Sequence, residues 1–248
     1  MKRIRLGVNI DHAATLRQVR GGETPYPDLI QLTHLCKKAG ADQITIHLRE
    51  DRRHIQVSDL RSLSEKCPLL LNLEMAATDQ MVSLAKRYKP DWVCFVPEKR
   101  QELTTEGGLD VLKGMAKLKS QISKLQVIGI ETSMFIEPSL KQVYASYDVG
   151  ADAIELHTGK WVRLTGAAKA KEWRRLEKAA HLAHALGLSV HAGHGLDYDS
   201  AAEVASLPHL RELNIGHSLI CHSLSSGLEF AVRKMVKNIE KGRREIRT

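Results

Sequence analysis

The 248-residue chain lacks several features that define common classes of protein. No apolar run approaches the ~18–20 residues that span a bilayer, so a membrane segment is not expected. The first apolar stretch ends at Asp11 and is too short for a signal peptide, which favours a cytoplasmic location. Aromatic residues make up only 4% and form no stacking motif. Nucleic-acid binding is therefore not expected, although the net charge of +8 favours anionic partners.

Motifs for metals and disulfides are also scarce. The cysteines are far apart, form no C-x-x-C pair and are expected to be reduced and packed: Cys36, Cys67, Cys94 and Cys221. No H-E-x-x-H motif is present, and the H-x-x-H spacing of His191 and His194 crosses a glycine turn instead of a helix face. No metal site is predicted, and the alternative would be a carboxylate-and-histidine site from Asp11, His12, His47 and Glu74.

Short apolar runs alternate with longer amphipathic runs through the whole chain. The short runs predict strands at Leu6–Ile10, Gln43–His47, Leu69–Leu73, Trp92–Val96, Val127–Ile130, Ala153–Leu156, Ser189–Ala192 and Glu212–Ile215. The amphipathic runs predict helices at Asp28–Lys38, Ser58–Lys66, Asp79–Tyr88, Leu109–Ser120, Ser139–Val149, Lys169–Leu186, Ser200–Ser206 and Ser218–Glu240. Glycines in "AGAD" (39–42) and "VGAD" (149–152) are placed to end the preceding helices in the left-handed conformation.

This alternation predicts the fold class and the domain organisation. Strand–helix units that fill one chain of this length, with no linker between them, are typical of an α/β protein with a (β/α)8 TIM barrel. We expect one domain over residues 1–248, with a basic C-terminal tail at about 241–248. A doubly wound open sheet is the alternative, and the lack of a G-x-G-x-x-G motif after the first strand weakens it.

Polar residues recur where the predicted strands end. A barrel carries its active site where the strands run into the following loops. The residues at these positions are Asn9, Asp11, His12, His47, Arg49, His54, Glu74, Glu131, Glu155, His157, His191, His194, Asn214 and His217. Their recurrence on most units predicts one active site.

Two glycine-containing turns predict a phosphate site. "AGHGL" follows the seventh strand, and "IGHSL" follows the eighth strand and opens a helix. Loops in these two places commonly bind phosphate in barrels, because bare backbone N–H groups and a helix N-terminus face the anion. Glycines that only make tight turns are the alternative. Arg17 and Arg20, in "LRQVRGG", are candidates for a second anionic group.

Three strand-end residues are candidates for proton transfer. Glu74 ends a very apolar strand, where partial desolvation would raise its pKa toward that of a useful general base. His47 ends another strand, and imidazole titrates near neutral pH. Glu155 is placed to hold a cationic intermediate. The alternative for Glu74 is a structural ion pair with an arginine, and the alternative for Glu155 is a buried partner of a histidine. The long loops at 97–108 and 157–169 are candidates for lids or binding segments.

Seven stretches closely resemble the pyridoxine 5′-phosphate synthase family: "GVNIDHAATLRQVRGG", "ITIHLREDRRHI", "NLEMA", "VPEKRQELTTEGGLDV", "IELHTG", "AGHGL" and "ELNIGHS". They run in order over nearly the whole chain, from about Leu6 to Gly227. The resemblance implies a (β/α)8 barrel that condenses 3-amino-2-oxopropyl phosphate with 1-deoxy-D-xylulose 5-phosphate. The implied products are pyridoxine 5′-phosphate, inorganic phosphate and water, formed with no metal and no organic cofactor.

The resemblance also implies a role for individual residues. His47 and Glu74 match the proton acceptors, His194 matches the proton donor, and Glu155 matches the glutamate that stabilises the transition state. The residues that match contacts to the amino-ketone phosphate are Asn9, Gly195, Gly216 and His217. The residues that match contacts to the deoxyxylulose phosphate are Asp11, His12, Arg49, His54 and Thr104. Arg20 matches an arginine that completes the site of a neighbouring subunit, within a family assembly that is a homo-octamer.

Two positions depart from the family's pattern, namely Cys221–His222 and His191. Neither is a matched proton-transfer residue. Two other readings remain open on the residues alone. One is a metal-dependent sugar-phosphate epimerase or lyase on the same barrel, and the other is a non-catalytic phosphometabolite-binding protein.

Overall fold

The computed structural model describes residues 3–98 and 107–244. Its strands are all parallel and close into a barrel in the order of the chain, with β1 beside β8. They are β1 Arg5–Asn9, β2 Gln43–His47, β3 Leu70–Met75, β4 Trp92–Phe95, β5 Glu131–Ile136, β6 Ala153–His157, β7 Ser189–Gly193 and β8 Leu210–Ile215. The predicted (β/α)8 barrel is therefore confirmed.

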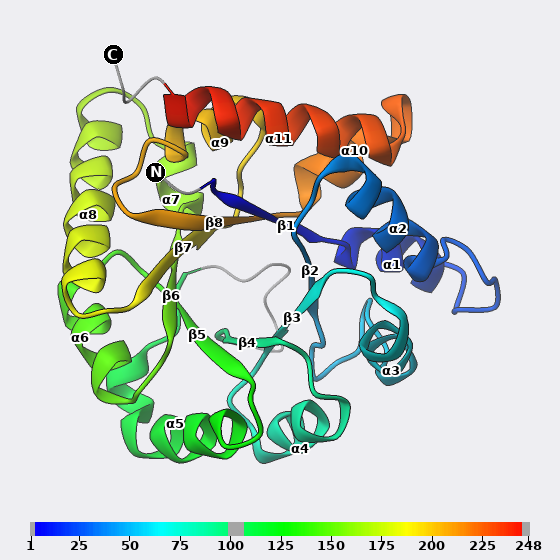
Figure 1. Ribbon diagram of the computed structural model, residues 1–248, viewed down its shortest axis with the longest axis horizontal. Coiled ribbons are helices and arrows are strands. Elements are labelled where there is room, and N and C mark those ends of the chain that lie inside the picture. The colour runs from blue at the N-terminus through cyan, green and yellow to red at the C-terminus, as the bar shows by residue number, and fades with distance from the viewer. Residues whose placement is uncertain (1–2, 99–106, 245–248) are drawn as a thin grey trace.

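Helices surround the barrel and cover the outer face of its strands (Figure 1). They are α1 Asp11–Gln18, α2 Leu29–Ala39, α3 Val57–Lys66, α4 Asp79–Tyr88, α5 Val111–Gln126, α6 Leu140–Asp148, α7 Gly159–Arg163, α8 Gly166–Ala185, α9 Tyr198–Val204, α10 His217–Ser226 and α11 Leu228–Arg244. Strands β2 and β6 are buried along their whole length, because the helices cover one face and the barrel interior the other.

Local sequence explains where several helices begin and end. Asp28 caps α2 by accepting hydrogen bonds from the backbone N–H groups of Ile30 and Gln31. Gly40 follows α2 with φ +96°, and Gly150 follows α6 with φ +84°. Both glycines adopt the left-handed conformation predicted for "AGAD" and "VGAD", which turns the chain from a helix toward the next strand.

The predicted fifth strand is wrong. Val127–Ile130 is instead the turn after α5, which extends to Gln126 and is longer than predicted. Gly129 adopts φ +84° in this turn, and Val127 is 83% exposed. Strand β5 begins at Glu131, so this carboxylate lies at the amino-terminal end of the barrel and not in the active site as predicted.

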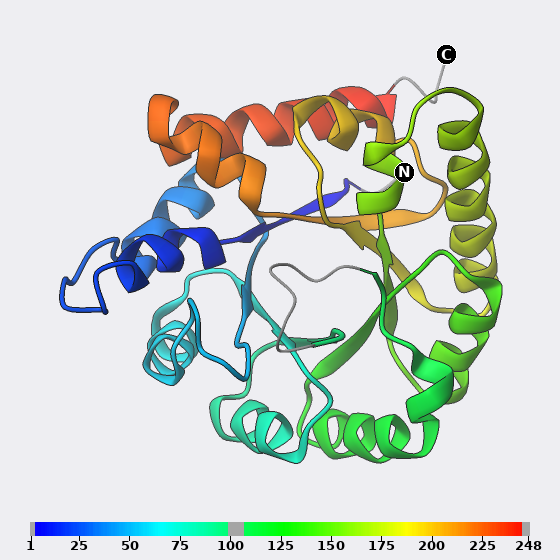
Figure 2. The ribbon, with the colours of Figure 1, turned by 180° about the vertical axis from the view of Figure 1, so that it is seen from behind.

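Three other segments differ from the predicted helices. The run at 218–240 forms two helices, because Gly227 breaks it with φ +79° and ψ +148°. The predicted long loop at 157–169 contains helix α7 and the start of α8. Helix α1, which begins at Asp11, is absent from the predicted set. The segment between α1 and α2 extends away from the barrel (Figures 1 and 2).

The cysteines are all free thiols, as predicted. Cys36 and Cys94 are buried and Cys67 is half-buried, but Cys221 is exposed on α10, so the prediction of a packed thiol is wrong there. Over residues 3–98 and 107–244, no helix is long and apolar enough to cross a membrane.

Gly242 marks a close contact between α11 and α9. A Cβ atom added there would overlap the backbone carbonyl oxygen of Ala202. Gly242→Ala is therefore expected to destabilise the fold by about 1–3 kcal/mol, because the two helices must separate. Urea denaturation would measure the change in the free energy of unfolding.

Gly114→Ala, in the first turn of α5, is the matched control. The nearest atom to the added Cβ is a methyl carbon of the Leu118 side chain at 3.3 Å, and this side chain can adjust. Alanine also favours a helix more than glycine, so this variant is expected to be neutral or slightly more stable. Equal stability of the two variants would contradict close packing at Gly242.

Candidate active site

A cavity of about 540 Å³ opens at the carboxyl ends of the barrel strands. Most of the predicted site residues line it, and they come from positions far apart in the sequence. They are Asn9, Asp11, His12, His47, Arg49, His54, Glu74, Glu155, His194, Gly195, Asn214, Gly216 and His217. The barrel therefore brings the predicted acid, base and phosphate-binding residues into one space.

Some predicted residues are not in this group. Thr104 lies outside the described residues. Arg20 is exposed on the segment after α1 and does not line the cavity. Arg17 is paired with Asp59, with nitrogen–oxygen distances of 2.5 and 2.8 Å, so it faces a carboxylate of its own chain. His191 lies in the middle of β7, not at its carboxyl end as predicted.

Asp11 connects the ends of β1 and β2. One of its oxygens accepts a hydrogen bond of 2.8 Å from the backbone N–H of His47, and the other accepts one of 2.8 Å from the Asn9 amide. Burial raises the pKa of Asp11 to about 7, although these hydrogen bonds and the charge of Arg49 lower it. Asp11 thus gains or loses a proton near neutral pH.

The imidazole of His47 is buried at the end of β2. Burial and the nearby charges of His54 and Arg49 lower its pKa to about 3, so the ring is neutral at neutral pH. His47 Nδ1 lies 4.0 Å from Glu74 Oε2. A neutral imidazole has a nitrogen lone pair, and therefore His47 is able to accept a proton.

Two carboxyls line the cavity, the half-buried Glu74 of β3 and the buried Glu155 of β6. Burial, together with the charges of Glu155 and Asp11, raises the pKa of Glu74 well above its usual range. Burial and the charge of Glu212 raise the pKa of Glu155 to about 8. Glu155 Oε2 accepts a hydrogen bond of 2.8 Å from the Asn214 amide. Glu155 is therefore able to exchange a proton near neutral pH, and the raised pKa of Glu74 makes its ionised form a stronger base than an exposed carboxylate.

The glycines on either side of His194 serve different purposes. A Cβ at Gly193 would lie 2.5 Å from Glu155 Oε1, so a side chain there would displace the carboxyl. Gly195 has φ +77°, a conformation that glycine adopts without strain. Burial and the charge of His157 lower the pKa of His194 to about 4. Gly193 and Gly195 therefore let the chain turn tightly around the buried carboxyl of Glu155 and place the His194 imidazole at the cavity.

The amino-terminal end of α10 forms another side of the cavity. Gly216 and His217 both line the cavity, and a Cβ at Gly216 would lie only 2.9 Å from Asn9 Cβ. The rings of His12 and His217 meet edge to face, with centroids 4.9 Å apart. The first N–H groups of a helix have no partner within the helix and favour an anion.

Three further residues belong to the site but were not among the predicted ones. Arg53 lines the cavity. Glu98 Oε1 lies 3.8 Å from His47 Nε2 and 3.6 Å from Arg49 Nε. Glu137, which follows β5, contacts the last residue of β6. Arg53 and Glu98 belong to stretches that carry the family resemblance, and this was their only signal in the sequence.

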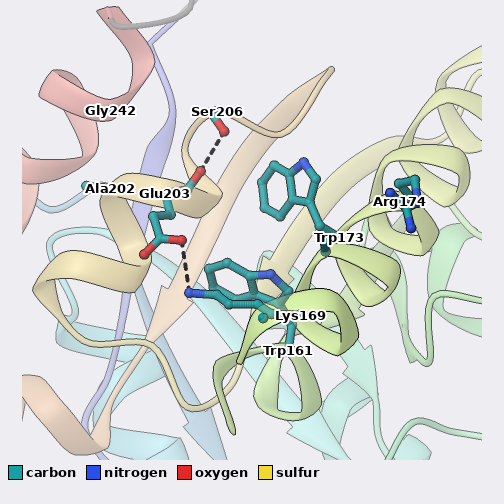
Figure 3. A pocket seen from close by; sticks show the side chains of 10 residues that line it. Trp161, Lys169, Trp173, Arg174, Ala202, Glu203, Ser206 and Gly242 are labelled. Carbon is teal, nitrogen blue, oxygen red and sulfur yellow. Dashed lines mark hydrogen bonds and ion pairs between the residues drawn. The ribbon is translucent and has the colours of Figure 1, made fainter. Parts of the chain in front are cut away.

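A second hollow lies outside the barrel, between α7, α8, α9 and the end of α11 (Figure 3). The ammonium of Lys169 lies 4.2 Å from the centroid of the Trp161 ring and 3.0 Å from a Glu203 oxygen. None of the predicted site residues lines this hollow. Within residues 3–98 and 107–244, no group of three histidine, cysteine or acidic side chains is arranged to hold a metal ion.

Solved structures with similar folds are distant in sequence. KGPDC from Streptococcus mutans superposes with a TM-score of 0.66 at 12% identity, covering 97% of this chain and 99% of that one. Phosphoribosylanthranilate isomerase from Thermotoga maritima gives a TM-score of 0.58 at 10% identity, covering 96% and 98%. At such identities, the similarity supports only the barrel fold.

Sequence comparison identifies much nearer relatives. Pyridoxine 5′-phosphate synthase of Bdellovibrio bacteriovorus is 67% identical over 235 residues, which cover 95% of this chain and 98% of the relative. The enzyme of the same name from Thioalkalivibrio sulfidiphilus is 49% identical, covering 97% and 98%. The family model described as pyridoxal phosphate biosynthesis protein PdxJ matches residues 6–241. The chain therefore belongs to the PdxJ family.

Proposed function

We propose that this enzyme is a pyridoxine 5′-phosphate synthase. It would condense 3-amino-2-oxopropyl phosphate with 1-deoxy-D-xylulose 5-phosphate into pyridoxine 5′-phosphate, with release of inorganic phosphate and water. The observation that carries this proposal is the composition of the cavity, where buried proton-transfer groups and candidate anion sites line one space. The names of the close relatives agree with it.

The two substrate phosphates need separate anion sites. In the proposed complex, the amino-ketone phosphate lies against Gly195, the amino-terminal end of α10 at Gly216–His217, and Asn9. The deoxyxylulose phosphate would be held by residues that follow β1 and β2, namely Asp11, His12, Arg49 and His54, together with Thr104. Placing two reactants side by side in one cavity lowers the entropic barrier to their condensation.

Imine formation, dehydration and loss of phosphate each require proton transfers. His47 is neutral and would accept a proton, as would Glu74 once it is ionised. His194 has a low pKa, and a bound phosphate anion would raise this pKa so that the ring carries a proton to donate. A developing cationic intermediate would likewise favour the ionised form of Glu155 and be stabilised by it. These steps use side chains only and require neither a metal nor an organic cofactor.

The proposed enzyme is also a homo-oligomer, with an octamer expected from the family resemblance. Arg20 is exposed on a segment that extends away from the barrel (Figure 1), so it is accessible to a neighbouring subunit. In the proposed assembly, Arg20 reaches the substrate bound in that neighbour.

A turnover assay in the presence of a chelator tests the proposed reaction. We expect the chelator-treated protein to form pyridoxine 5′-phosphate and free phosphate in equal amounts from the two substrates. Mass spectrometry would follow the first product, and a colorimetric assay would follow the second. Activity that appears only after a divalent ion is added, and on another sugar phosphate, would contradict the proposal and support an epimerase or lyase.

A further inference from the structure

The last residue of β6 is a histidine, His157, and the proposed reaction gives its side chain no role. This ring is buried, and its Nδ1 lies 2.7 Å from Glu137 Oε1. The same oxygen accepts a hydrogen bond of 3.2 Å from the backbone N–H of Gly108. The hydrogen bond from His157 lowers the pKa of Glu137, so this side chain is a carboxylate that only accepts. Nδ1 of His157 therefore carries a proton.

The other ring nitrogen of His157 lies near the ring of the proposed proton donor, since a Cβ added at Gly159 would meet both His157 Nε2 and His194 Cδ2. Nε2 is buried and has no hydrogen-bond partner within the described part of the chain. The centroids of the His157 and His194 rings are 5.0 Å apart, and Phe135 packs against the edges of both. A buried polar nitrogen without a partner is unfavourable unless a function retains it.

The two residues after His157 also hold His194 in place. The Thr158 hydroxyl lies 2.7 Å from the carbonyl oxygens of both Gly193 and His194. His194 has φ +80°, which is unfavourable for a residue with a Cβ and persists only when neighbouring contacts fix it. A Cβ at Gly159 would lie 2.7 Å from both imidazole rings, so only glycine leaves room for the pair.

We propose that Glu137 and His157 are a positioning pair for His194. Glu137 holds His157 with its proton on Nδ1, which leaves the Nε2 lone pair free to accept a hydrogen bond from the ring of His194. That contact fixes the orientation of His194 and directs its second nitrogen to the substrate. This role rests on the proposed function, in which His194 donates a proton. Such hydrogen bonds are often long in an empty site and shorten when the substrate binds.

Several titratable or charged groups from other elements lie near His194. Arg163 from α7 and His12 from α1 lower the pKa of His194 by their charge, and His157 from β6 does so only when its ring is protonated. In the positioning pair His157 is neutral and accepts a hydrogen bond from His194, which favours the protonated form of His194. Removal of the His157 imidazole is therefore expected to lower the pKa of His194. A purely structural role of His157 would not produce this shift in titration.

The test is to measure kcat, KM and the titration of His194 in the His157→Gln and Glu137→Gln variants. We expect His157→Gln to lower kcat by about 10–100-fold with KM changed less than about threefold, as for other residues that orient a catalytic group. Glu137→Gln is expected to lower kcat by a smaller factor than His157→Gln. Glu137→Asp keeps a carboxylate and is expected to have a kcat between those of Glu137→Gln and the native protein. The double variant is expected to be no slower than His157→Gln, because residues that act as a unit are not additive.

Nuclear magnetic resonance of 15N-histidine-labelled protein would follow His194 directly and does not depend on turnover. His191→Gln is the matched control, since His191 is also buried and lies 3.5 Å from a carboxylate, Glu212. The control is expected to leave the His194 titration unchanged, whereas His157→Gln is expected to lower the pKa of His194. An unchanged titration with wild-type kcat in His157→Gln would overturn the positioning pair. If the protein has no synthase activity but the His194 titration still shifts in His157→Gln, the proposed function is contradicted. The contact between His157 and His194 is then still supported.

Discussion

The Glu74→Gln variant is expected to lose about 10²–10⁴-fold in kcat, because an amide cannot accept the proton that a carboxylate accepts. Glutamine has the same shape, so the cavity and the 4.0 Å approach to His47 are expected to persist. The proposed anion sites lie elsewhere in the cavity, and phosphate binding is expected to change by less than about threefold. Rapid-quench kinetics would measure the chemical step, and calorimetry with inorganic phosphate would measure binding.

Glu131→Gln is the control for this variant. Both residues are glutamates on barrel strands, but Glu131 begins β5 whereas Glu74 lies near the end of β3. Glu131 is therefore at the opposite end of the barrel from the cavity, and its variant is expected to retain wild-type kcat. Full turnover by Glu74→Gln would contradict the assignment of this residue as a base. Equal losses in both variants would indicate damage to the barrel instead.

The same pair of glutamates shows which part of the site the sequence could predict. Glu74 lies near the end of a mainly apolar strand, so its place at the mouth of the barrel follows from the pattern. Strand β5, in contrast, reads "ETSMFI" and is preceded by the more apolar turn at 127–130. A strand placed on that turn is followed by Glu131, whereas the observed strand is followed by Glu137, so the sequence pattern predicts the wrong glutamate for the site. An error of six residues in one strand thus exchanges one carboxylate for another.

The other strands were predicted within two residues of their observed bounds, because strands buried on both faces read as short apolar runs. The alternation of strand and helix was then sufficient to predict the closed barrel and to place the site at the carboxyl ends of its strands. Contacts that depend on side-chain direction could not be predicted in this way. His191 and His194 are three residues apart, yet the first packs on Trp92 inside the barrel and the second lines the cavity.

The Glu155→Gln variant is expected to be more stable than the native protein at alkaline pH, although it should lose activity. Burial and the charge of Glu212 raise the pKa of Glu155 from 4.5 to about 8 in the folded protein. Between these two values the unfolded chain ionises this carboxyl while the folded protein keeps it protonated. The unfolded state therefore binds fewer protons, and folding stability falls as the pH rises.

The size of the effect follows from the separation of the two pKa values. Each pH unit between 4.5 and 8 lowers the stability of the native protein by up to about 1.4 kcal/mol through this one group. Glutamine does not titrate, and its oxygen can still accept the hydrogen bond of the Asn214 amide. We expect the two proteins to be similar in stability near pH 4.5, and the variant to gain more than about 2 kcal/mol by pH 8.5.

Urea denaturation of both proteins at pH 5 and pH 8.5 measures this difference, and Glu172→Gln is the matched control. Glu172 is also buried, but its oxygens lie 2.7 Å from Arg175 and 3.2 Å from Lys160. Removing its charge leaves these cations unpaired, so this variant is expected to be less stable than the native protein at pH 8.5. A loss of stability in Glu155→Gln at pH 8.5 would show that the native carboxylate is well solvated or paired there. The expected gain would instead show that the barrel retains an unfavourable buried carboxyl for its chemistry.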